Sequence, residues 1–204
     1  AYCSFVAQSV EKSFALVEPY LAALFDEIES AGAMVRSLGL NIKSFYMGGG
    51  TPTTLTAEQM NRLLTKLEQS FDLTRLAEST IEAGRPDTID PEKLAVLRAH
   101  QITRVSVNPQ TMEDHVLSTI GRRHTADDIR RAMGEVMKAG FPHVNMDLIA
   151  GLPEDTPAGF RRSLDEVISM GADNITVHTL SLKKGSRITL EGSRIPSADE
   201  VAEM

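Results

Sequence analysis

Glycine and polar residues follow the apolar segments that this sequence predicts as strands. The clearest case is residues 48–53, Gly-Gly-Gly-Thr-Pro-Thr, directly after the apolar run 42–47. Glycines at a strand end leave backbone N–H groups accessible, so these groups can donate hydrogen bonds to a ligand. Ligands of parallel α/β proteins bind at the carboxyl ends of the strands. The segment therefore indicates a binding site, although alone it does not identify the ligand.

The other predicted strand ends supply side chains of both charges. Glu82 and Asp147 are carboxylates within otherwise apolar strands, which is costly unless each has a partner or a ligand. Gln110 can both donate and accept hydrogen bonds, and Arg122 can pair with a carboxylate through two parallel bonds. Together these residues predict a polar site at one edge of a sheet.

Structural interpretations of the same residues stay open on the sequence alone. A glycine-rich strand end can be a plain tight turn, Glu82 can pair with Arg85, and Asp147 can cap a neighbouring loop. An ordinary barrel enzyme with a phosphate in the glycine loop is a further alternative, but Lys43 lies on the wrong side of the strand end and the P-loop lysine is absent. No two histidines have the spacing of metal ligands. We expect three of them at the surface: His100, His115 and His124.

Strands and helices alternate along the chain. A long amphipathic helix at 19–38 comes first, and the predicted strands are 42–47, 79–83, 103–107, 143–149 and 174–180. Capping residues mark the starts of later helices: Thr56, Asp90, Thr125, Thr156 and Ser197. This order predicts an α/β protein with a parallel sheet and right-handed crossovers. Because an eight-fold barrel needs about 250 residues, we expect a partial, barrel-like sheet without its first strand.

Composition limits the classes of partner. The chain has 204 residues, of which 42% are hydrophobic, and we read it as one domain because its composition shows no break. A net charge of −7 without a basic run argues against nucleic-acid binding. No apolar run approaches the roughly 18 residues of a membrane span, so we expect no integral membrane segment. Cys3 is the only cysteine, which excludes an intrachain disulfide and fits a cytoplasmic protein.

Six ordered segments resemble one enzyme family. They are residues 1–5, 46–53, 81–86, 104–110, 120–125 and 145–153. This set resembles the radical SAM enzymes and, within them, the oxygen-independent coproporphyrinogen III oxidase group with its coproporphyrinogen dehydrogenase-like branch. The resemblance covers essentially the whole chain, and the ordered motifs make it far more specific than the glycine segment alone.

The resemblance implies a fold, two cofactors and a reaction. The family fold is a partial (β/α)6 barrel that binds S-adenosylmethionine and a [4Fe–4S] cluster held by the thiolates of a C-x3-C-x2-C motif. The family reaction converts propionate side chains to vinyl groups with loss of CO2, taking coproporphyrinogen III to protoporphyrinogen IX in haem synthesis. An electron donor such as a flavodoxin or ferredoxin is implied as a partner, besides the porphyrinogen or haem itself.

The resemblance also assigns residues. Cys3 matches the third cluster thiolate, and Tyr2 matches the aromatic side chain beside it that faces S-adenosylmethionine. The other implied S-adenosylmethionine contacts are Gly49, Gly50, Thr51, Glu82, Gln110, Arg122, Asp147 and, more weakly, Ser181. The reasoning from the residues agrees, because a zwitterion joined to a ribose needs carboxylate, guanidinium and backbone partners.

Two features depart from the family pattern. The chain begins two residues before Cys3, and one thiolate cannot hold a cubane cluster. We therefore expect residues 1–204 to be a radical SAM core domain truncated at both ends, without the C-terminal substrate-covering region, free of the cluster and inactive by itself. Phe5 stands where the oxidases carry a further cysteine, a pattern of oxidase-like relatives, some of which bind or deliver haem. A haem-binding or haem-delivery protein on the same scaffold is the alternative function.

Overall fold

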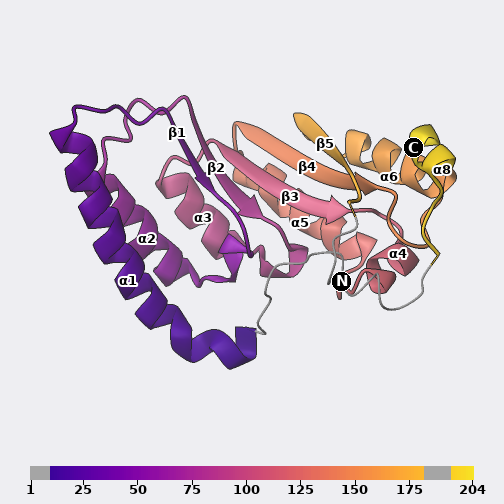
Figure 1. Ribbon diagram of the computed structural model, residues 1–204, viewed down its shortest axis with the longest axis horizontal. Helices are drawn as coiled ribbons and strands as arrows, with labels where there is room; N and C mark the ends of the chain where they lie inside the picture. Colours follow the sequence, from indigo (N-terminus) through magenta and orange to yellow (C-terminus); the bar gives the residue numbers. More distant parts are fainter. Residues whose placement is uncertain (1–9, 182–193) are drawn as a thin grey trace.

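The computed structural model describes residues 10–181 and 194–204. The predicted site residues Tyr2 and Cys3, and Phe5, lie outside the described residues. Helices and strands alternate as the sequence predicts (Figure 1). The elements are α1 (Val10–Ser37), β1 (Ser44–Met47), η1 (Pro52–Thr54), α2 (Ala57–Ser70), β2 (Glu78–Ala83), η2 (Pro86–Thr88), α3 (Pro91–Ala99), β3 (Arg104–Gln110), α4 (Asp114–Thr119), α5 (Ala126–Ala139), β4 (His143–Ala150), α6 (Pro157–Ser169), β5 (Asn174–Thr179) and α8 (Ala198–Glu203).

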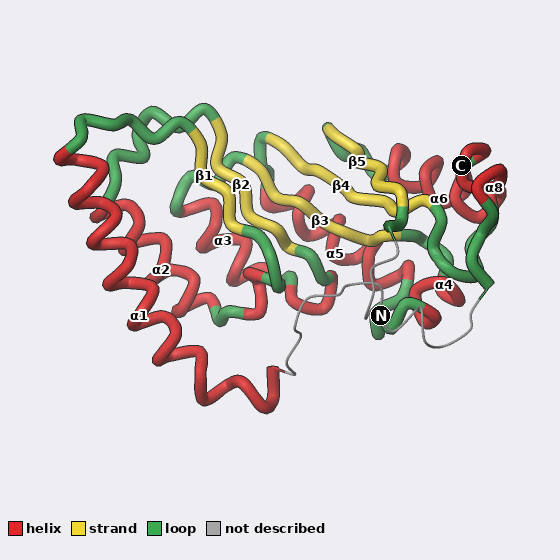
Figure 2. Tube along the Cα trace, in the orientation of Figure 1, coloured by secondary structure: helices red, strands yellow, loops and turns green. Residues whose placement is uncertain are grey.

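The five strands form a single open sheet. Their spatial order is the chain order, β1-β2-β3-β4-β5, and every neighbouring pair is parallel. Parallel neighbours need crossover connections, and a helix supplies each of them here (Figure 2). The predicted α/β class and the partial, barrel-like parallel sheet are therefore confirmed.

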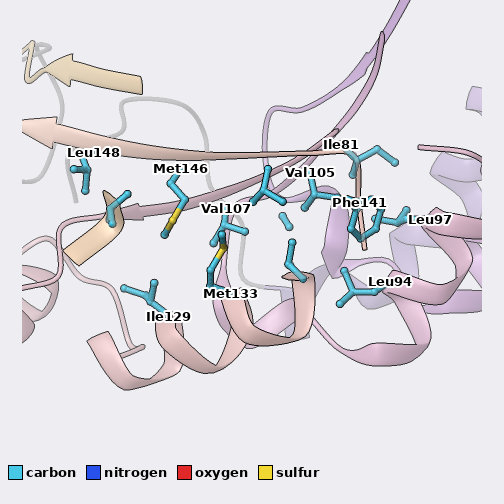
Figure 3. Close-up of a cluster of buried hydrophobic side chains, with 14 of the residues drawn as sticks. Ile81, Leu94, Leu97, Val105, Val107, Ile129, Met133, Phe141, Met146 and Leu148 are labelled. Atoms are coloured by element: carbon cyan, nitrogen blue, oxygen red, sulfur yellow. The ribbon is translucent and has the colours of Figure 1, made fainter. Parts of the chain in front are cut away.

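One face of the sheet is apolar and packs on the helices. In Figure 3, side chains from β2, β3 and β4 point toward apolar side chains of α3 and α5. The residues of this cluster include Ile81, Leu94, Leu97, Val105, Val107, Ile129, Met133, Met146 and Leu148, all 3% exposed or less. Because side chains alternate along a strand, the residues between them face the other side of the sheet. That opposite face carries the polar residues.

Helix α1 begins earlier than the sequence predicts, at Val10 rather than at Pro19. A proline inside a helix has no N–H for the carbonyl four residues back, here that of Ala15. Ala15 is exposed, so water can hydrogen-bond to that carbonyl. Downstream of the proline, Leu21 and Ile28 pack against Leu63 of α2. No helix among the described residues is long and apolar enough to cross a membrane.

The predicted helix starts are confirmed at the level of single hydrogen bonds. Thr56, Thr125 and Ser197 each form a capping box with the residue three positions later. The side chains of Asp90 and Thr156 accept the corresponding backbone N–H before helices that open on proline. These bonds satisfy donors that the first helical turn would otherwise leave free. They fix where the loops that follow the strands must end.

The C-terminal segment lies against the loop that follows β4. The Glu154 N–H donates to the Arg194 carbonyl at 2.9 Å, and the Arg194 guanidinium donates to the Asp155 carbonyl at 2.9 Å. The Gly151 N–H points at the Met204 sulfur, 3.2 Å away. Residues 194–204 therefore help to hold the loop at the carboxyl end of β4.

Candidate functional site

The glycine loop and the end of β2 meet at the carboxyl edge of the sheet. The Gly49 N–H donates to Glu82 Oε2 at 3.2 Å, and the Tyr46 hydroxyl donates to Glu82 Oε1. Among the ion pairs of the described residues, none joins Glu82 to Arg85, so that alternative pairing is not adopted. Although the Tyr46 side chain is largely exposed, desolvation of its hydroxyl and the Glu82 carboxylate raise the pKa of Tyr46, so the hydroxyl stays protonated and remains a donor.

The three glycines of the loop differ in how far their surroundings require glycine. A Cβ on Gly48 would lie 2.5 Å from Tyr46 Cε1 and 2.8 Å from Glu82 Cδ, so a larger residue would have to displace that pair. Gly49 has a φ of 109°, a backbone conformation that other residues rarely adopt. Gly50 has open space at its Cβ position. Gly48 is thus required by packing and Gly49 by conformation.

The turn after the glycine loop is tied to helix α3. The Lys93 ammonium donates to the carbonyls of Thr53 at 2.9 Å and Thr88 at 3.1 Å, and it also pairs with Asp90. Its donors therefore point to η1 and η2 and position the chain that follows Thr51. This lysine does not supply the cation that a phosphate in the glycine loop would need.

Asp147 lies on the same polar face, at β4. Burial raises the pKa of its carboxyl, and the charge of Glu82 acts in the same direction, because two like charges resist joint ionisation. The Asn145 amide donates to Asp147 Oδ1 at 2.6 Å and lowers that pKa, as do the imidazole of His178 and the hydroxyl of Thr176. The negative charge of Glu82, on β2, thus reaches Asp147, on β4.

Gln110 occupies a strained position at the end of β3. The sequence predicts that this strand ends at Val107, whereas the structure continues it to Gln110 through a register shift against β4. Gln110 has a φ of 74° and is buried, and its amide donates to the Asn108 carbonyl at 3.0 Å. A non-glycine residue held in this region costs free energy, and such residues cluster at functional sites.

Arg122 lies in the loop between α4 and α5 and reaches the end of β2. Its guanidinium donates to the Gly84 carbonyl at 3.0 Å, two residues beyond Glu82. The nearby His124 is only 6% exposed, so its expected surface position is wrong. Burial and the positive charge of Arg122 lower the pKa of His124, which favours the neutral imidazole. By contrast, His115 is exposed as expected, and His100 bonds to Glu68 and Asn61.

The structure therefore gathers most of the predicted site residues at one edge. Gly49 and Glu82 are in contact, Asp147 interacts with Glu82 through its charge, and Arg122 joins the same edge at Gly84. Ser181 is exposed and lies two residues beyond the end of β5. Within residues 10–181 and 194–204, no three His, Cys, Asp or Glu side chains lie close enough together to hold a metal ion.

Comparison with known proteins identifies the family. The family model of the Radical SAM superfamily matches residues 1–167. The chain belongs to the radical SAM superfamily. Membership implies S-adenosylmethionine and a [4Fe–4S] cluster as cofactors, and it replaces the alternative of an ordinary phosphate-binding barrel. The polar edge of the sheet lies within the part of the chain that matches this family.

Two curated relatives align over all of this chain. The oxygen-independent coproporphyrinogen-III oxidase-like protein HemZ of Bacillus subtilis is 39% identical over 207 residues, which cover 100% of this chain and 41% of HemZ. The heme chaperone HemW of Lactococcus lactis is 30% identical over 210 residues, covering 100% of this chain and 52% of HemW. The chain thus spans about half, or less, of the relatives it matches.

A solved structure shows the same fold. The coproporphyrinogen III oxidase HemN from Escherichia coli, a radical SAM enzyme, superposes with a TM-score of 0.85 at 27% identity. The match covers 99% of this chain and 46% of that enzyme. This chain is therefore related to coproporphyrinogen oxidases and to heme chaperones alike.

Two residues of the polar edge were missed by the sequence reasoning. Tyr46 holds Glu82, and Asn145 holds Asp147. Asn145 precedes Asp147 by two positions, and the strand period of two therefore puts both on one face. The same period aligns Tyr46 with the polar face of β1, next to its neighbour strand β2. A search for polar residues two positions before each predicted site residue would have found Asn145.

Proposed function

We propose that this chain binds S-adenosylmethionine at the carboxyl edge of its sheet. The observation that carries the proposal is the pair of carboxylates, Glu82 and Asp147, on one face of the sheet. Their like charges repel each other, and Glu82 is bonded to the glycine loop. S-adenosylmethionine carries a sulfonium, an ammonium and one carboxylate, and so has a net positive charge. A cation of this kind relieves the repulsion between the two carboxylates.

The residues present fit the remaining parts of the ligand. The loop of Gly49, Gly50 and Thr51 offers backbone groups to the methionyl end, and Arg122 offers a guanidinium to its carboxylate. The buried amide of Gln110 can both donate to and accept from the ligand. Cys3 and Tyr2 complete the proposed site, as a cluster ligand and a neighbouring aromatic. When bound, the cluster and S-adenosylmethionine supply radical chemistry, while these residues bind the ligand and orient it.

We further propose that the full-length protein acts on a porphyrinogen, as an oxygen-independent coproporphyrinogen oxidase does. The relationship to HemZ of Bacillus subtilis and to HemN of Escherichia coli supports this substrate class. Residues 1–204 are in this proposal the radical SAM core, and an external electron donor would reduce the cluster. Each propionate side chain would lose CO2, one hydrogen atom and one electron in becoming a vinyl group, with the hydrogen atom taken up by the adenosyl group of S-adenosylmethionine and the electron by an acceptor.

A second candidate is haem binding or delivery on the same scaffold. Phe5 favours it, because the oxidases carry a cysteine at that position and some oxidase-like relatives that lack it bind haem. The heme chaperone HemW of Lactococcus lactis, 30% identical, supports the same alternative. The two candidates share the S-adenosylmethionine site and differ in what the protein does with a tetrapyrrole.

One anaerobic experiment separates the candidates. The reconstituted full-length protein is incubated with coproporphyrinogen III, S-adenosylmethionine and a reductant, and protoporphyrinogen is measured. Formation of protoporphyrinogen supports the oxidase, whereas tight haem binding without that product supports the carrier. The cluster assignment has its own test in the gene: the C-x3-C-x2-C motif requires a cysteine codon directly before Ala1 and another four codons earlier.

A further inference from the structure

The amide of Asn145 is the centre of a hydrogen-bond network that joins three strands. Asn145 is 7% exposed and lies on β4. Its Nδ2 donates to Asp147 Oδ1 at 2.6 Å and to Ser106 Oγ of β3 at 2.9 Å. Its Oδ1 accepts from Asn174 Nδ2 at 2.6 Å and from Thr176 Oγ1 at 3.1 Å, both on β5. All four hydrogen-bonding positions of the amide are therefore used.

This network leaves the amide only one orientation. The Ser106 hydroxyl accepts from Asn145 and donates onward to Asn108 Oδ1 at 2.8 Å, so its proton is already used. Turning the amide over would place its oxygen against the Asp147 carboxylate and its NH2 against the Asn174 NH2. Both contacts would be repulsive. The strands on either side thus aim one amide proton of Asn145 at Asp147.

The Asn145 proton aimed at Asp147 opposes the two effects that raise the pKa of this carboxyl. Burial and the charge of Glu82, on β2, favour the neutral carboxyl. The imidazole of His178, on β5, favours the carboxylate, but the hydrogen bond from Asn145 is the largest of the favourable contributions. Removing the Asn145 donor would therefore leave Asp147 uncharged over a wider pH range.

We propose that Asn145 is a positioning residue that holds Asp147 as an oriented carboxylate, ready for a cationic ligand. The inference rests on the proposed function, in which Asp147 contacts S-adenosylmethionine. Asn145 itself has no free donor or acceptor for a ligand, because its four positions are taken within the sheet. It acts through Asp147, whereas Tyr46 donates a hydrogen bond to the other carboxylate, Glu82.

The test variant is Asn145→Asp, which has nearly the same shape. It keeps an acceptor for Asn174 and Thr176, and the Ser106 hydroxyl can turn to donate to it, but it loses the proton aimed at Asp147. The matched control is Asn174→Ala, which removes one bond to Asn145 Oδ1 and leaves the bond to Asp147 in place. If Asn145→Asp fails a thermal-melting check, Asn145→Ala removes the same donor and adds neither a charge nor a hydroxyl donor.

The readout is the dissociation constant of S-adenosylmethionine, measured by anaerobic calorimetry on the reconstituted full-length protein across a pH series. Free S-adenosylmethionine has the same pKa values in every experiment. Differences in pH dependence between wild type and variants therefore come from groups of the protein. We expect Asn145→Asp to bind about tenfold more weakly near neutral pH. The pH below which affinity falls should move upward relative to wild type. Asn174→Ala should keep the wild-type midpoint.

The outcomes separate this inference from the proposed function. If Asp147→Asn binds S-adenosylmethionine as tightly as wild type, the proposed role of Asp147 fails, and the inference fails with it. If Asp147→Asn weakens binding while Asn145→Asp leaves the pH midpoint in place, only the role of Asn145 is overturned. A loss of affinity that is equal at every pH and equal in Asn174→Ala would mean a merely structural role and would also overturn it.

Discussion

The two faces of the five-stranded sheet differ because alternate residues of each strand meet different surroundings. On β2, Ile81 and Ala83 are fully buried against the helices, whereas Glu82 between them is half-buried on the polar face. On β4, Met146 and Leu148 point into the core seen in Figure 3, and Asp147 lies between them. The comparison indicates that burial on the apolar face stabilises the fold, whereas the polar face carries the residues of the proposed binding site. Changes on the polar face should therefore affect stability less than changes in the core, and should affect binding more.

The largest expected effect belongs to the apolar face. Ile81→Ala removes a fully buried side chain from the core, and we expect a loss of about 2–5 kcal/mol in the free energy of unfolding. Thr80→Val, at the neighbouring position of the polar face, removes a 2.9 Å bond to Glu78 and should cost about 1 kcal/mol. Denaturant unfolding of both variants measures the difference. Equal losses would contradict the division between the faces.

A change of charge on the polar face should affect binding instead. Glu82→Gln removes the carboxylate that Tyr46 and Gly49 hold, and we expect S-adenosylmethionine to bind about 10 to 100-fold more weakly. The matched control is Glu78→Gln on the same strand and face, which loses the 2.8 Å ion pair with Arg104. Calorimetry should find near wild-type affinity in the control. A comparable loss in both variants would show a general effect of charge.

The glycine loop offers a comparison within a single turn. Gly48→Ala places a Cβ against Tyr46 and Glu82, and we expect a loss of about 1–3 kcal/mol in stability from the forced displacement. Gly50→Ala meets nothing within 4 Å, so its free energy of unfolding should change by less than about 0.5 kcal/mol. Thermal or denaturant unfolding measures both. Similar stabilities would mean that the Tyr46–Glu82 pair moves aside without cost.

The smallest effect is the cost in stability of keeping Asp147 on the polar face. Its pKa is raised in the folded protein, so the folded state binds more protons than the unfolded state above the unfolded pKa of about 3.9. Stability contributed by this group is therefore lost as the pH rises from that value through the folded pKa. We expect Asp147→Asn to be more stable than wild type at neutral pH. The two unfolding free energies should converge as the pH falls, and a constant difference would contradict the assignment.

Much of the fold could be predicted because its signals are local. The capping residues Thr56 and Ser197 form the predicted boxes with side chains three positions away, in a single helical turn. The alternation of apolar runs and amphipathic segments predicts the parallel sheet for the same reason. Pro19 and Pro109 are the exceptions. Proline usually interrupts a helix or a strand, whereas α1 continues through Pro19 and β3 continues through Pro109.

The burial of His124 could not be predicted from its neighbours in the sequence. The segment around it is polar, with two arginines directly before it, and such a segment is typical of a surface loop. The packing of the loop against the end of β2, where Arg122 meets Gly84, decides its environment. Contacts of this kind join residues that are far apart in the chain.

The sequence by itself determined the order of the elements, the polar and apolar faces of each strand, and the motif residues of a radical SAM protein. Only the tertiary structure decided which partner each polar residue meets. Glu82 bonds to Tyr46 and Gly49 rather than to Arg85, and Asn145 serves Asp147 because β3 and β5 orient its amide. The physical reason is register. The alternation of side chains between two faces is a property of a single strand, whereas a hydrogen bond across strands depends on how distant segments align.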